Sequence, residues 1–80
     1  MADEVQDPRP DIARNVRRLM DDRGISIEEL VERSELSEPK IARFLAAEAE
    51  PTASELLRLA GALEAGTSQL LERISWGSDG

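Results

Sequence analysis

The most constraining feature of this chain is a pair of short helical patterns joined by about three residues. Ser26 and Glu29 form an S-x-x-E capping box, in which the serine oxygen and the glutamate satisfy each other's free backbone N–H groups at a helix start. Ser37 is the next N-cap candidate, and Pro39 follows it in a first turn, where a missing N–H costs nothing. The sequence therefore predicts a helix over residues 27–34, a tight turn, and a second helix over residues 38–46 or beyond.

One further helix is expected before this pair. Either Asp7, ahead of Pro8, or Asp11 can begin it. Gly24 ends it near residue 23, because glycine tolerates a positive φ. Its apolar residues recur at helical spacing and form one stripe, made of Ile12, Val16, Leu19 and Met20.

Two more helices are expected after the pair. Thr52 and Glu55 repeat the capping-box pattern and predict a helix over residues 53–64, with Gly66 beyond it. Thr67 is a cap candidate for a short fifth helix that carries Leu70, Leu71 and Ile74. The predicted fold class is therefore all-α, a five-helix bundle without strands. We expect one domain over residues 11–75, a flexible acidic tail over 1–10 and a C-terminal tail over 76–80.

Composition excludes several kinds of function. The 80 residues include no cysteine and no histidine, which rules out a disulfide framework, a thiolate or histidine zinc site and a histidine base. No nucleophile pairs with a base and no glycine loop would cradle a phosphate, so we expect neither an enzyme nor a cofactor. The chain has no apolar run of membrane-spanning length and no signal-peptide pattern, so a cytoplasmic location is expected. The net charge is −7, and any affinity for DNA must therefore come from a local basic patch.

This order of helices resembles the phage-repressor and Cro type of helix-turn-helix domain, a family of bacterial regulators. The resemblance rests mainly on core and cap positions, which are Arg23, Gly24, Ile25, Ser26, Leu30, Leu36, Ser37, Ile41, Phe44, Pro51, Leu56, Leu59, Ala60, Leu63, Leu70 and Leu71. It implies a repressor-like bundle in which helices 2 and 3 form the helix-turn-helix. Helix 3 would lie in the major groove of double-stranded DNA, and a homodimer would read half-sites about one DNA turn apart.

The resemblance also implies which side chains read bases. The first exposed positions of helix 3 are Glu38, Pro39 and Lys40, with Arg43 one turn further on. Arg43 can pair bidentately with a guanine, and Glu38 can accept from a cytosine amine. Glu38 has an alternative role as a first-turn carboxylate near the positive end of the helix dipole.

Contacts to the DNA backbone are expected from Ser26, from the N–H groups near Ala53 and from a ridge formed by Arg14, Arg17 and Arg18. The alternative for this ridge is ion pairing on its own helix with Asp11, Asp21 and Asp22. The glutamine that the family often places after the helix 2 cap is Ile27 here, so that phosphate contact is lost.

Two other departures concern packing. Many relatives carry an arginine and a glutamate at the positions of Met20 and Leu45, where they form a partly buried ion pair. Because both partners are apolar here, we expect Met20 to pack against Leu45 without leaving a buried charge unpaired. The family glycine that closes helix 3 is Ala47, which predicts that helix 3 extends by about a turn.

Charge keeps a second function open. Residues 26–38 hold five glutamates against Arg33 alone, a net charge of −4 on the side expected to face DNA. The alternative to a DNA-binding regulator is therefore an acidic interaction module, antitoxin-like or anti-repressor-like, that meets a basic protein partner. The apolar residues near the C-terminus predict a dimer interface made of Leu70, Ile74 and Trp76, although Trp76 folding back over helix 1 is an equal alternative.

Overall fold

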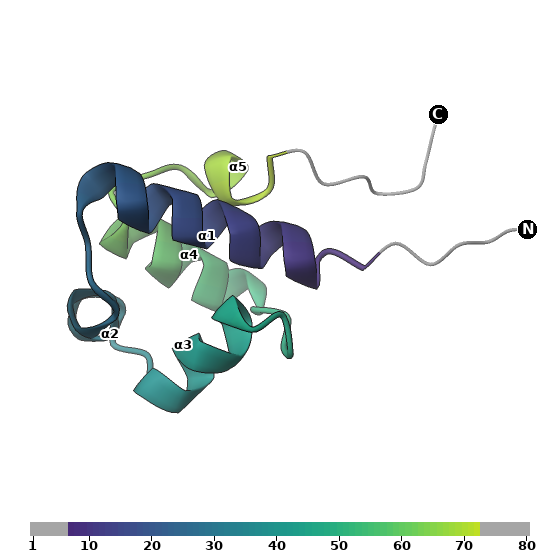
Figure 1. Cartoon of the computed structure of the whole chain (residues 1–80), viewed down its shortest axis with the longest axis horizontal. Helices are drawn as coiled ribbons and strands as arrows, with labels where there is room; N and C mark the ends of the chain where they lie inside the picture. Colours follow the sequence, from purple (N-terminus) through teal and green to yellow (C-terminus); the bar gives the residue numbers. More distant parts are fainter. Residues whose placement is uncertain (1–6, 73–80) are drawn as a thin grey trace, which may run out of the picture.

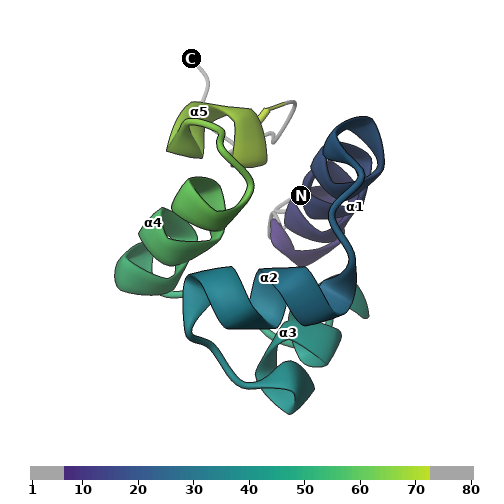
Figure 2. The same cartoon turned by 90° about the vertical axis from the view of Figure 1, so that its left-hand side faces the viewer.

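The computed structural model describes residues 7–72 as a five-helix domain, and these residues contain no strand. The helices are α1 (Arg9–Arg23), α2 (Ile27–Ser34), α3 (Glu38–Leu45), α4 (Ala53–Ala62) and α5 (Thr67–Leu70). Helices α2 and α3 lie at one end of the molecule and α5 at the other, with α1 and α4 between them (Figures 1 and 2). The predicted all-α class is confirmed.

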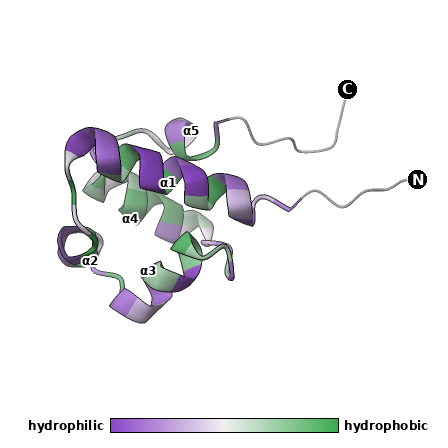
Figure 3. Ribbon diagram, in the orientation of Figure 1, coloured by the Kyte–Doolittle hydropathy of each residue, from purple (hydrophilic) through white to green (hydrophobic). Residues whose placement is uncertain are grey.

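The core forms where these helices face one another. Leu30 of α2, Ile41 of α3, Leu63 after α4 and Leu70 of α5 are completely buried, and the predicted α1 residues Ile12, Val16 and Leu19 join them. Met20 is only partly buried at the edge of this cluster. The hydropathy colouring shows the outward side of α1 as hydrophilic (Figure 3). The helix-turn-helix is thus held against a core to which all five helices contribute.

Local caps fix most of the helix boundaries. The side-chain oxygens of Ser26 and Thr52 accept from the backbone N–H groups of Glu29 and Glu55 at 3.1 and 3.2 Å, so both predicted capping boxes are present. Helix α1 begins at Arg9, two residues before the expected domain boundary, and it ends at Arg23, followed by Gly24 with φ 64°. Helix α4 ends two residues earlier than expected, and Gly66 rather than Thr67 precedes α5.

The predicted extension of α3 is wrong. The helix ends at Leu45, and Ala47 adopts a left-handed conformation with φ 62°. The N–H of Ala47 donates to the Phe44 carbonyl and the N–H of Glu48 donates to the Arg43 carbonyl, at 3.1 and 2.8 Å, which is the Schellman arrangement of a helix end. Alanine therefore adopts a left-handed conformation that glycine favours at helix ends, against its own preference for continuing a helix.

The two apolar positions of α1 and α3 that were expected to pack together, Met20 and Leu45, both lie at the edge of the core. Met20 and Leu45 line the same shallow pocket of about 250 Å³ between the two helices. A polar link lies beside them, since Arg17 Nη2 donates to the Leu45 carbonyl oxygen at 2.6 Å. Met20 and Leu45 thus face the same space between α1 and α3, beside one arginine that is bound to a backbone carbonyl.

Candidate nucleic-acid interface

Helix α3 is anchored by its buried side and exposes the other. Ile41 and Phe44 insert into the core, at 0% and 4% exposure. The four residues predicted to contact bases all lie on the exposed side of the helix, namely Glu38, Pro39, Lys40 and Arg43. Ser37 caps the helix by accepting from the backbone N–H of Lys40 at 3.3 Å. The start of α3 is therefore a fixed, solvent-facing surface.

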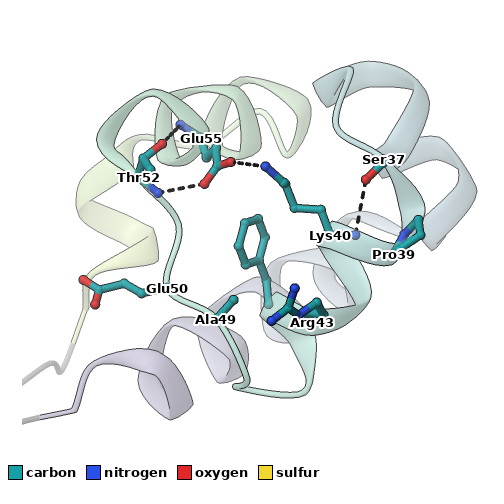
Figure 4. Close-up of a pocket in the computed structure, with 9 residues that line it drawn as sticks. Ser37, Pro39, Lys40, Arg43, Ala49, Glu50, Thr52 and Glu55 are labelled. Atoms are coloured by element: carbon teal, nitrogen blue, oxygen red, sulfur yellow. Dashed lines mark hydrogen bonds and ion pairs between the residues drawn. The ribbon is translucent and has the colours of Figure 1, made fainter.

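The two cations of this surface have different surroundings. Lys40 Nζ lies 2.8 Å from Glu55 Oε2, in an ion pair that joins α3 to the start of α4. The Arg43 guanidinium forms no hydrogen bond or ion pair with any residue in the range 7–72. In Figure 4 Lys40 extends across to Glu55, while Arg43 stays on the α3 side. Of the two, Arg43 has its guanidinium available to an external acceptor.

Glu55 is held by two donors at once. Besides the Lys40 ammonium, the backbone N–H of Thr52 donates to Glu55 Oε1 at 2.8 Å. The Glu55 side chain is only 15% exposed. The Lys40 ammonium, followed by the Thr52 N–H, lowers the pKa of the Glu55 carboxyl below its ordinary value. This carboxylate thus stays charged while it completes the cap of α4 and binds Lys40.

A pocket of about 460 Å³ lies between α3 and the segment leading into α4 (Figure 4). It is lined by Ser37, Pro39, Lys40, Arg43, Phe44, Ala49, Glu50, Thr52 and Glu55. Ala53 opens α4 beside it and is exposed, so the predicted backbone N–H site remains on the surface. Pro51 is buried and fixes the path of the connecting segment.

The three arginines of the α1 ridge each bind an acceptor within the chain. Arg14 Nη1 lies 2.9 Å from Asp11 Oδ1, and Arg18 Nη2 lies 2.9 Å from Glu72 Oε1. Arg17 donates to the Leu45 carbonyl. The expected alternative of pairing on the same helix therefore holds for Arg14, while Arg17 and Arg18 bind acceptors in other parts of the chain. Neither of these two acceptors was evident from helical spacing.

The acidic surface of α2 remains largely exposed. Glu28 and Glu32 are exposed on α2, and Glu38 is exposed at the start of α3. Glu29 accepts from the Ser26 N–H, and Glu35 pairs with Arg58 of α4 at 3.2 Å. Ser26 uses its hydroxyl in the cap, so its contact with DNA would have to come from other atoms or by sharing that oxygen.

Of the three residues predicted to form the dimer interface, the structure describes the surroundings of Leu70 alone. Leu70 is 0% exposed and belongs instead to the monomer core, so its side chain offers no surface to a second copy. Ile74 and Trp76 lie outside the described residues. Asn15, which the sequence did not single out, holds this end of the molecule together: its buried Nδ2 donates to the carbonyls of Leu70 and Glu72 at 2.7 and 2.9 Å.

Helices α2 and α3, joined by a tight turn and supported by the other three, define a helix-turn-helix DNA-binding domain. Comparison with protein families places it more narrowly, because residues 15–75 match the Cro/C1-type helix-turn-helix DNA-binding domain. The chain belongs to this family, whose members are DNA-binding domains and not typically enzymes. No curated protein matches the chain closely enough to count as a relative. Within residues 7–72, every helix is too short or too polar to span a bilayer.

Proposed function

We propose that this DNA-binding regulator recognises a specific sequence by placing α3 in the major groove. The observation that carries the proposal is the state of Arg43, exposed on α3 and without an acceptor among residues 7–72. A guanidinium in this position can pair bidentately with the O6 and N7 atoms of a guanine. Glu38 and Pro39 lie one turn earlier and line the approach to the same base pairs.

Contacts to phosphates come from the flanks in this proposal. Arg14 and Arg17 are exposed on α1, next to α3, and the N–H groups at Ala53 open α4 on its other side. Arg18 points to Glu72 at the α5 end, so we assign it to the fold. We place the protein in the bacterial cytoplasm, where such a regulator meets its DNA.

We further propose that the protein acts as a homodimer through the segment that follows α5. Helix α5 lies at the end of the molecule opposite α2 and α3 (Figure 2), so a contact there leaves α3 uncovered. Ile74 and Trp76 are the apolar residues in the sequence of residues 73–80. A two-fold dimer of this family reads a palindrome with half-sites about 10 base pairs apart.

The test is selection of the full-length protein on a random duplex pool, followed by affinity measurements on the enriched sequence. We expect a palindrome, and we expect Arg43→Ala to lose about 1–3 kcal/mol of discrimination between it and random DNA. Arg18→Ala is the matched control, because it removes the same charge and should weaken binding to the selected duplex and to random DNA about equally. Failure to enrich any sequence would contradict the proposal and favour the acidic interaction module, with a basic protein as its partner.

A further inference from the structure

We infer that Glu55 is a positioning residue that withholds Lys40 from DNA and so limits the sequence-independent part of the protein's affinity. The inference rests on the proposed function and goes beyond it, because it assigns a binding role to a residue that otherwise only caps α4. It concerns one juxtaposition, that of the α3 ammonium and the α4 carboxylate.

Lys40 is bound within the protein through both its side chain and its backbone. Its ammonium is 2.8 Å from Glu55 Oε2, while its own backbone N–H is fixed by Ser37. Lys40 is exposed, so in the absence of Glu55 its flexible stem would let the ammonium reach a nearby phosphate. Glu55 is the less mobile partner, because its other oxygen is bound to the Thr52 N–H and its side chain is mostly buried. The carboxylate therefore sets where the lysine points.

The ion pair of Lys40 with Glu55 determines which cations of α3 are free to contribute to DNA affinity. An ammonium that neutralises a phosphate releases a counterion and adds equally to the affinity for every sequence. An ammonium held by Glu55 adds no such term, and Arg43 is left as the open cation of α3. In a chain of net charge −7, this arrangement keeps non-specific binding low and leaves affinity dependent on base contacts.

The first experiment needs no DNA. We would follow the Glu55 carboxyl by NMR through an acid titration of the wild-type protein and of Lys40→Gln. Because the ammonium is the main cause of the lowered pKa, the titration of Glu55 should move to higher pH in Lys40→Gln. An identical titration in the two proteins would show that the pair does not form and would overturn the inference, whatever the DNA results.

The second experiment measures affinity for the selected duplex and for random duplex over a range of salt concentrations. Glu55→Gln keeps the capping box, since a glutamine oxygen can still accept from the Thr52 N–H, but it loses the charge that holds Lys40. We expect the slope of log K against log salt to steepen by about 0.9 for both duplexes. That corresponds to an extra gain in affinity of about 3.5-fold for each fourfold dilution of salt.

Two controls separate release of Lys40 from simple loss of an acidic charge. Glu50→Gln removes the same charge from the lining of the same pocket, and Glu50 forms no ion pair with another residue in 7–72. Its effect should be equal in the wild-type and Lys40→Gln backgrounds, whereas the effect of Glu55→Gln should shrink to that of Glu50→Gln when Lys40 is absent. Two results would overturn the inference: a Glu55→Gln effect that still exceeds that of Glu50→Gln in the Lys40→Gln background, or no excess over Glu50→Gln in the wild-type background. If the wild-type protein selects no sequence, the proposed function has failed, and this result is known before any variant is compared.

Discussion

Helices α1 and α3 use their polar residues in opposite ways. On α1, three arginines each bind an acceptor within the chain, namely Arg14, Arg17 and Arg18. The buried Asn15 amide donates to two backbone carbonyls. On α3, Arg43 has no such acceptor in the described part of the chain. The α1 arginines are therefore each bound within the chain, whereas the Arg43 guanidinium of α3 is bound by none of residues 7–72.

The ends of the two helices differ in the same sense. Both close with a residue in the left-handed region, Gly24 after α1 with φ 64° and Ala47 after α3 with φ 62°. Glycine adopts this conformation freely, whereas alanine is strained in it by about 1–2 kcal/mol. The α3 end therefore stores strain that the α1 end avoids, next to the surface proposed to bind DNA.

The largest expected effect on stability comes from removing the buried amide of α1, that of Asn15. Asn15→Ala removes two hydrogen bonds and leaves the carbonyls of Leu70 and Glu72 without their donor. The bond to the Leu70 carbonyl is buried, and a buried unsatisfied group costs about 1–3 kcal/mol, so we expect the free energy of unfolding to fall by about 1–3 kcal/mol. Urea unfolding measures this change.

The matched control is Arg14→Ala, on the neighbouring exposed position. It loses one ion pair with Asp11 on the same helix, so its effect should stay within about 0.5 kcal/mol. A comparably small loss for Asn15→Ala would mean that this amide does not hold the α5 end to α1.

The sequence predicted what local chemistry determines. The start of α2 follows from one capping box, and the predicted range of this helix matches the structure to the residue. The core positions of α1 follow from helical spacing. The end of α3 was not predictable, because alanine favours continuing a helix and only the Schellman bonds and the packed segment around Pro51 end it. The pairs of Lys40 with Glu55 and of Arg17 with the Leu45 carbonyl join residues 15 and 28 positions apart. Such contacts depend on how helices cross, which no spacing rule gives.

A smaller effect, of opposite sign, is expected at the end of α3. Ala47→Gly relieves about 1–2 kcal/mol of left-handed strain but increases the freedom of the unfolded chain by about 0.4–1 kcal/mol. We therefore expect stability to rise by up to about 1.5 kcal/mol in thermal or urea unfolding. Ala46→Gly is the control, because Ala46 has φ −86° and gains nothing from glycine, so that variant should be destabilised. If both variants lose stability equally, Ala47 is not strained and the two helix ends do not differ.

The smallest expected effect is the acid dependence contributed by Glu55. Its pKa is lowered in the folded protein by the Lys40 ammonium and the Thr52 N–H, so its charged form is favoured by folding. The resulting stability is present above the ordinary glutamate pKa of 4.5 and is lost as the pH falls through the lower folded value. Because Lys40 is half exposed, the ion pair contributes about 0.2–1 kcal/mol. Between neutral pH and the acid side of this transition, Glu55→Gln should therefore lose slightly less stability than the wild-type protein. Parallel pH profiles for the two proteins would show that folding does not favour the Glu55 charge, and the α3 surface would then have two uncommitted cations in place of one.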